Sequence, residues 1–295
     1  MRYKAVGALE HDTVRLARLG PRGDEVPAIL DGGAARDLRA VTDDIDAAFL
    51  AGGGIERARA ALARGELPEL DGAAEMRAGS PLARPGAVIC IGMNYAAHAA
   101  ESGAVPPELP VVFLKTPNTV GGPDDPVAIP RGSTRTDWEV ELGVVIGRRA
   151  SYLDSPADSL AHVAGFAIAD DLSERDFQLV QSGGQWSKGK CAPGFSPTGP
   201  WLVTPDEVDH RALRLRSYVN GEPRQDSSTA DMVFDVEFIV WHLSQYMALE
   251  PGDLLLTGTP EGVALSGRFP YLRAGDVVEL EIDGLGRQRH EMVAA

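Results

Sequence analysis

The sequence predicts an α+β fold in which β-structure predominates. Short runs of strand-forming residues recur along the chain, and only one longer stretch, residues 235–247, has apolar residues at helical spacing. The 33 glycines and 21 prolines interrupt the strand-like runs at short intervals. This punctuation is typical of sheets built from turns and short strands rather than of alternating strand–helix units.

The chain is expected to divide near residue 80. Residues 71–85 contain several glycines and prolines and are interpreted as a linker. A small N-terminal α/β module, residues 1–80, would precede a larger module, residues 81–295, which holds all the candidate chemistry. In the small module, strands are expected at residues 2–9, 14–19 and 28–30, and one or two short helices at 45–64. In the larger module, strands are expected at residues 87–91, 111–114, 138–146, 163–169, 201–204, 213–219, 254–257 and 277–282.

Composition restricts the partners and the compartment. The formal net charge of −15 argues against nucleic acid or an anionic membrane as a partner, because those polyanions require clustered lysine and arginine. Two cysteines are too few for a disulfide framework, and no secretion signal or membrane span of roughly 18 apolar residues is evident. A cytoplasmic location is therefore expected. A small anionic substrate stays compatible with the charge if a metal or lysine reverses the local field.

Two glutamates lie two positions apart in the strand expected at residues 138–146. Side chains alternate faces along a strand, so Glu139 and Glu141 point the same way, with Cα atoms about 7 Å apart. The apolar run at 144–146 indicates a strand buried on both faces. Two buried carboxylates on one face offer hard oxygen ligands to a divalent metal. The solvated face of a half-exposed antiparallel strand is the alternative interpretation.

A histidine and a glutamate three positions apart form a second candidate pair. His98 and Glu101 follow a loop and fall in a stretch expected to form a helical turn, where they share one face. A carboxylate in this position can orient and charge the imidazole, which is the arrangement of a general base with its helper. A surface histidine beside an acidic neighbour is the alternative.

Further charged residues follow the strand expected at 163–169. Asp170 and Asp171 point to opposite sides if the strand continues, so only one of them could join the two glutamates; Asp170 could equally cap a following helix. Lys190 lies beside a glycine in a loop. Three carboxylates with one dication keep a net negative charge, and the Lys190 ammonium could neutralise it. The turn at 257–262 could hold a substrate carboxylate or only reverse the chain.

Residues 85–295 resemble the fumarylacetoacetate hydrolase family, because five motifs appear in the order that family has them. These motifs are Gly92-Met93-Asn94-Tyr95 with His98 and Glu101; Asp137-Trp138-Glu139-Val140-Glu141-Leu142; Asp171 with Ser173 and Arg175-Asp176; Gln185-Trp186 with Gly189-Lys190; and Thr257-Gly258-Thr259-Pro260. The sequence of these motifs is similar to that of bacterial 2,4-diketo-3-deoxy-L-rhamnonate-type hydrolases. The resemblance implies the family's mixed β-sandwich roll.

The resemblance also implies a role for eight residues. The implied ligands of Mg²⁺ or Mn²⁺, with Ca²⁺ as an alternative, are Glu139, Glu141 and Asp171. The implied catalytic residues are His98 with Glu101, which activate water, and Lys190. The implied substrate contacts are Gln178, Lys190 and Thr259.

The reaction that this resemblance implies is hydrolysis of the C–C bond of a 2,4-diketo acid, an acylpyruvate, to pyruvate and a second carboxylic acid. His98 would deprotonate water, which adds to the C4 carbonyl, and the cation and Lys190 would stabilise the resulting enolate. The alternative is an oxaloacetate decarboxylase or a 2-hydroxy-dienoate isomerase or tautomerase that uses the same site. A homodimer is the expected assembly.

Overall fold

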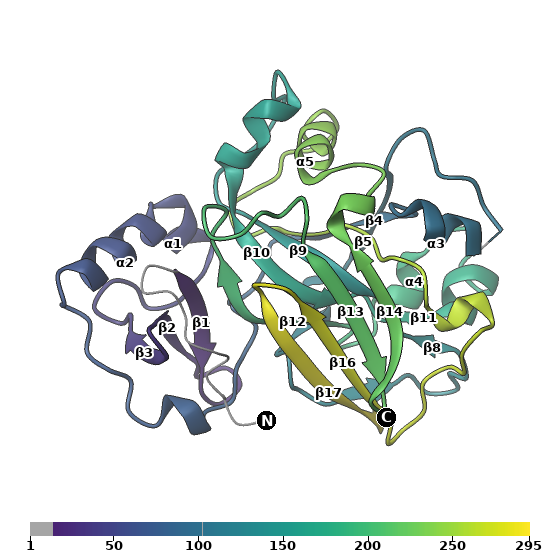
Figure 1. The fold of residues 1–295 in the computed structure, drawn as a ribbon, viewed down its shortest axis with the longest axis horizontal. Helices are drawn as coiled ribbons and strands as arrows, with labels where there is room; N and C mark the ends of the chain where they lie inside the picture. Colours follow the sequence, from purple (N-terminus) through teal and green to yellow (C-terminus); the bar gives the residue numbers. More distant parts are fainter. Residues whose placement is uncertain (1–13, 102) are drawn as a thin grey trace.

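The computed structural model describes residues 14–101 and 103–295, and a ten-stranded sheet runs through the middle of it (Figure 1). The expected strand at residues 2–9 lies outside the described residues. In spatial order the sheet contains β3 (Ala34–Asp37), β2 (Val26–Asp31), β1 (Arg15–Leu19), β12 (Ser196–Val203), β10 (Val163–Asp170), β9 (Val140–Ile146), β15 (Leu254–Leu256), β4 (Val88–Gly92) and β5 (Val111–Lys115), with β6 (Val120–Gly121) paired to β12.

A second, five-stranded sheet packs against the first, and its strands β13, β14, β16 and β17 are coloured green to yellow in Figure 1. Its order is β14 (Glu222–Ser228), β13 (Arg214–Val219), β16 (Val277–Ile282), β17 (Gly286–Ala294) and β7 (Val127–Ile129). A short ladder joins β8 (Thr136–Asp137) to β11 (Ser173–Glu174). Most neighbours are antiparallel, but β15 with β4, β17 with β7 and β12 with β6 are parallel. The prediction of a mixed, predominantly β fold is confirmed.

Helices are short and lie around the sheets (Figure 1). The α-helices are α1 (Ala47–Ala51), α2 (Gly54–Ala63), α3 (Ala96–Glu101), α4 (Ser187–Lys190) and α5 (Val236–Ser244). Single turns of 3₁₀ helix occupy Ala73–Glu75, Pro117–Thr119, Thr229–Asp231 and Ala264–Ser266, a longer 3₁₀ helix occupies Pro156–His162, and a π-helical turn occupies Asp176–Val180. Asp235 begins α5 by accepting a hydrogen bond from the Phe238 amide, as its sequence position favours. Within the part of the chain that is described, no helix is long and apolar enough to cross a membrane.

Strand β9 is buried on both faces, as the apolar run at 144–146 indicates. Val144 belongs to the core between the two sheets, whereas Val145 belongs to a second core that includes Phe49 and Ala58 of the N-terminal helices. Strands β1 to β3 extend the large sheet through hydrogen bonds between β1 and β12. The large sheet therefore contains strands from both sides of residue 80. The division of the chain into two domains at that point stays a prediction.

The structure differs from the expected strands in several places. The strand expected at residues 138–146 begins two residues later, because β9 starts at Val140 and pairs with β10, whereas β8 ends at Asp137 and pairs with β11. The short strands β3, β6, β7, β8 and β11 are absent from the expected set. The longer strands β14 and β17 are absent from it too, since their sequences are rich in charged and polar residues. Each nevertheless turns buried side chains inward, among them Gln225 in β14 and Gln288 in β17.

Gln288 holds the five-stranded sheet to the large sheet. Its side-chain amide, fully buried, donates to the carbonyl oxygens of Ile168 at 2.8 Å, Gly199 at 3.0 Å and Pro197 at 3.2 Å. These carbonyls lie on β10 and β12, so one side chain fixes the spacing of three strands. Loss of the amide would leave buried acceptors without a partner.

We expect Gln288→Met to destabilise the protein by about 2 kcal/mol, because the replacement keeps the volume but leaves buried carbonyls unsatisfied. Equilibrium denaturation in urea measures this change. The matched control is Glu291→Met on the exposed face of the same strand, which should stay within about 0.5 kcal/mol of wild type. Equal effects of the two variants would contradict the role of Gln288.

Candidate active site

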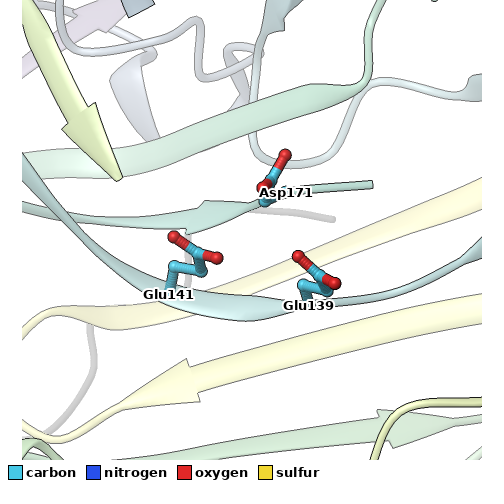
Figure 2. Close-up of side chains that lie close together, drawn as sticks. All are labelled: Glu139, Glu141 and Asp171. Atoms are coloured by element: carbon cyan, nitrogen blue, oxygen red, sulfur yellow. The ribbon is translucent and has the colours of Figure 1, made fainter. Parts of the chain in front are cut away.

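Three buried carboxylates meet where β9 and β10 lie side by side (Figure 2). Glu141 lies in β9, Glu139 immediately precedes that strand, and Asp171 immediately follows β10. One oxygen of each carboxylate lies within 4.8 Å of the other two. Figure 2 shows the two glutamates on one segment, with both side chains directed toward Asp171. The alternative of a solvated face for the glutamates is wrong, because both are at least 95% buried (exposed fractions of 5% and 1%).

Asp170 points away from this cluster, as strand alternation requires. Its Oδ1 accepts a hydrogen bond from the Glu139 amide at 2.9 Å, and its Oδ2 lies 3.0 Å from Nε2 of buried His290. The residues that follow form β11 and not a helix, so the interpretation of Asp170 as a helix cap is wrong. The Asp171 amide donates to the Glu139 carbonyl at 3.0 Å, which fixes the backbone between the two acidic segments.

Three buried cations contact the carboxylate cluster. Nζ of Lys190 lies 2.7 Å from an oxygen of Glu139 and 2.7 Å from an oxygen of Asp171. Arg175 donates from Nη2 to the other Glu139 oxygen at 2.7 Å. Lys115 donates from Nζ to the other Asp171 oxygen at 2.5 Å. Two of the three carboxylates are therefore paired on both oxygens.

Lys115 and Arg175 contact the carboxylates, and the sequence analysis assigns neither of them to the site. Lys115 is the last residue of an otherwise apolar strand, β5, and a lysine at a strand end usually reaches solvent. Arg175 appears within one of the motifs, but its distance from the glutamates in sequence gives no sign of contact. The structure buries its guanidinium between Glu139 and Asp137, with Nε 2.8 Å from the Asp137 oxygen.

Of the three clustered carboxylates, Glu141 is the one that forms no ion pair with a lysine or arginine among the described residues. Burial, followed by the nearby charges of Asp171 and Glu139, raises the pKa of Glu141 well above its ordinary value. Burial also opposes the charge on Glu139, but Lys190 and Arg175 outweigh it and lower the pKa of Glu139 to about 2. Among the described residues, the Glu141 carboxylate accepts one hydrogen bond, from the Gly258 amide at 2.8 Å. This uncompensated oxygen donor, beside two further carboxylates, fits a hard divalent cation.

The predicted histidine–glutamate pair is confirmed as a contact. Nδ1 of His98 lies 3.1 Å from Oε1 of Glu101 on α3, and both side chains are largely buried. Glu101 also accepts a hydrogen bond from the Gly262 amide at 3.0 Å, so this loop holds the carboxylate in place. With the proton of the neutral ring on Nδ1, facing the carboxylate, Nε2 keeps its lone pair and can accept a proton.

Gly262 has to be a glycine for the loop to reach Glu101. Its φ is +102°, and a Cβ there would lie 2.3 Å from the Arg224 carbonyl oxygen. Only glycine accommodates both the backbone conformation and this close approach.

Gln178 and Thr259 also border the site. Oε1 of Gln178 accepts from Arg175 at 2.9 Å. The Thr259 hydroxyl donates to the Val140 carbonyl at 2.9 Å and accepts from Nε2 of Gln225 at 2.7 Å. Its single proton is therefore used within the protein, and a contact from this hydroxyl to a substrate would have to be made as an acceptor.

The side chains of the site line one cavity of about 350 Å³. Every residue assigned to the site from sequence lines it, namely His98, Glu101, Glu139, Glu141, Asp171, Gln178, Lys190 and Thr259. Arg175 lines it as well, whereas Lys115 lies behind Asp171. The arrangement can hold a cation at the carboxylates and present a base, Nε2 of His98, to a molecule bound beside it.

A mixed β fold with three clustered carboxylates and a histidine–glutamate pair lining one cavity agrees with the family that the sequence motifs indicate. The chain is a member of the fumarylacetoacetate hydrolase family, because the family model described as Fumarylacetoacetate (FAA) hydrolase C-terminal matches residues 87–293. A Burkholderia multivorans protein whose name assigns it to the hydrolases without a substrate is 47% identical over 280 residues, covering 93% of this chain and 97% of that protein.

Two solved structures resemble the chain over nearly its whole length. Maleylpyruvate hydrolase from Sphingobium sp. SYK-6, in complex with manganese(II) and pyruvate, superposes with a TM-score of 0.78 at 28% identity, covering 95% of this chain and 99% of that one. The 2-hydroxyhepta-2,4-diene-1,7-dioate isomerase from Mycobacterium marinum superposes with a TM-score of 0.74 at 32% identity, covering 95% and 98%. The family thus includes both hydrolases and isomerases, and one relative binds manganese.

We expect Glu141→Gln to abolish metal binding without destabilising the metal-free protein. The folded-state pKa of Glu141 is raised, so its stabilising contribution is present below its ordinary value of 4.5 and is lost as pH rises through the folded value. In chelator at pH 8 the variant should therefore melt at or above the wild-type temperature. Excess Mn²⁺ should raise the wild-type melting temperature by about 5 °C and leave the variant unchanged.

The control for this experiment is Glu222→Gln, which removes an exposed carboxylate of β14 outside the cavity. It should keep the full response to Mn²⁺. A response to Mn²⁺ in Glu141→Gln equal to that of wild type would remove Glu141 from the metal site.

Proposed function

We propose that the protein is a divalent-cation-dependent hydrolase that cleaves the C–C bond of an acylpyruvate to pyruvate and a second carboxylic acid. The observation that carries this proposal is the His98–Glu101 pair in the same cavity as the three carboxylates. A base beside a cation site suits a reaction in which water attacks the bound molecule. The similarity to a maleylpyruvate hydrolase that binds manganese and pyruvate supports the same reaction class.

Glu139, Glu141 and Asp171 would hold the cation, Mg²⁺ or Mn²⁺. When bound, the cation supplies Lewis-acid polarisation of the substrate's oxo and carboxylate oxygens. A bound cation would share these ligands with Lys190, because the ammonium already contacts two of the same carboxylates and offsets part of their charge.

The protein's own residues provide the base and the positive field. Nε2 of His98 takes a proton from water, and Glu101 stabilises the imidazolium that forms. The water oxygen adds to C4 of the substrate, the C3–C4 bond breaks, and its electron pair stays with the pyruvate fragment, which takes up a proton at C3. Burial opposes the charge on Lys190, but Asp171 and Glu139 raise the pKa of Lys190 above its usual value. Lys190 therefore stays positive and stabilises developing negative charge without giving up its proton.

Isomerisation of a 2-hydroxy-dienoic acid is the second candidate, and the similarity to an isomerase favours it specifically. Decarboxylation of oxaloacetate is a related alternative. Both reactions need the cation site but no nucleophilic water, so their products separate them from hydrolysis.

The first test is an assay of the purified protein with acetylpyruvate, in Mg²⁺ and in excess chelator, with coupled detection of pyruvate. We expect metal-dependent release of pyruvate together with loss of the enol absorbance. No pyruvate, together with metal-dependent turnover of oxaloacetate or of a hydroxy-dienoate, would replace hydrolysis by decarboxylation or isomerisation.

We expect His98→Ala to lower kcat for acylpyruvate hydrolysis by about 10²- to 10⁴-fold, since general-base catalysis contributes that range. The Mn²⁺-dependent rise in melting temperature should persist, because His98 is not among the three carboxylates of the cation site. Glu101→Gln should retain more activity than His98→Ala, because the base itself remains. An unchanged kcat in His98→Ala would remove this histidine from the mechanism.

A further inference from the structure

The lining of the cavity combines charged and apolar side chains. Besides the carboxylates and their cations it includes five apolar side chains, here called its apolar end, namely Met93, Phe113, Leu179, Trp186 and Leu265. The two kinds of side chain meet at Phe113, because Nζ of Lys190 lies 5.0 Å from the centre of its ring. A substrate whose oxo-acid part binds at the carboxylates would place its acyl group against these apolar side chains.

Trp186 and Phe113 form a fixed aromatic wall at the apolar end. Their ring centres are 5.4 Å apart at an interplanar angle of 60°. The indole lies directly on the backbone of Gly92, where a Cβ would come within 2.3 Å of the ring. The wall is therefore packed on both sides and offers a rigid apolar surface to a bound acyl group.

The cations that line the cavity are already paired. Lys190 contacts Glu139 and Asp171, and Arg175 contacts Glu139 and Asp137. Among the described residues, Arg268 is a further cation that contacts a residue of the lining: its guanidinium lies over Phe269 and 4.0 Å from Glu101, and its side chain is 61% exposed. It is not part of the lining. A second carboxylate on the acyl group would thus enter an apolar wall without a partner, in a protein of net charge −15.

We infer that the substrate is an acylpyruvate whose acyl group is apolar and uncharged, bound against Phe113, Trp186 and Leu179, and not one that carries a second carboxylate. The inference rests on the proposed function and specifies its substrate class. The inferred substrate differs from the one in the name of the Mycobacterium marinum isomerase, which is a dioate and so carries two carboxylates.

The test compares two substrates of equal size. Succinylpyruvate ends in a carboxylate, and 4-methylpentanoylpyruvate carries an isopropyl group in its place, so the two differ only in the charge and polarity of the distal end. We expect kcat/KM with Mg²⁺ to be at least about tenfold higher for the isopropyl substrate, because an unpaired buried carboxylate is disfavoured by that factor or more. Equal values, or a preference for succinylpyruvate, would overturn the inference and leave the hydrolase function standing. Cleavage of neither substrate would remove the proposed function, and the inference with it.

A charge-introduction variant tests where the acyl group binds. Leu179 lines the cavity and is 45% exposed, so an arginine there keeps access to water. Leu179→Arg should raise the ratio of kcat/KM for succinylpyruvate to that for the isopropyl substrate by about tenfold, through a new charge pair. The control is Val180→Arg, which adds the same charge one residue along, outside the lining and at a position 71% exposed, and should leave this ratio unchanged. An unchanged ratio in Leu179→Arg, or an equal change in both variants, would overturn the placement of the acyl group.

Discussion

Charge compensation around three buried carboxylates is the constraint on which the rest of the site depends. Isolated carboxylates in such a position would take up protons. Lys190 and Arg175 keep Glu139 ionised, and Lys115 pairs with Asp171. Glu141 is left without a cation of its own. The positive charges therefore contact Glu139 and Asp171, and Glu141 is the carboxylate of the three that makes no ion pair among the described residues.

The fold satisfies this constraint by bringing distant segments to one place. Antiparallel pairing of β9 and β10 sets Asp171 opposite the glutamates, while β5 delivers Lys115 and α4 delivers Lys190. Strand alternation then turns Asp170 away, where it holds the Glu139 backbone. The site is thus a product of sheet register, and a shift by one residue would exchange the roles of Asp170 and Asp171.

Local patterns in the sequence account for the carboxylates and for the His98–Glu101 pair. Alternation along a strand predicts that Glu139 and Glu141 share a face, and helical spacing predicts the contact between His98 and Glu101; both are confirmed. The family resemblance selected Asp171 over Asp170 and added Gln178 and Thr259, all of which line the cavity as does Lys190. Lys115 was missed because its partner is 56 residues away in sequence, and no local period reports such a contact. The two polar strands, β14 and β17, are not recognisable from hydrophobic alternation, because their buried residues include Gln225, Gln288 and His290.

The division of the cavity has a consequence for how such a protein can diversify. The charged groups are buried side chains that lie in or directly beside β9, β10 and α4, so a change there disturbs both folding and chemistry. Leu179 and Leu265, by contrast, lie on a single helical turn and a 3₁₀ turn between strands. Under the proposed function, natural variation in these turns can alter which acyl chain fits while the buried charges stay constant. Descendants of one ancestral chain could in this way come to accept different acids without rebuilding the reaction.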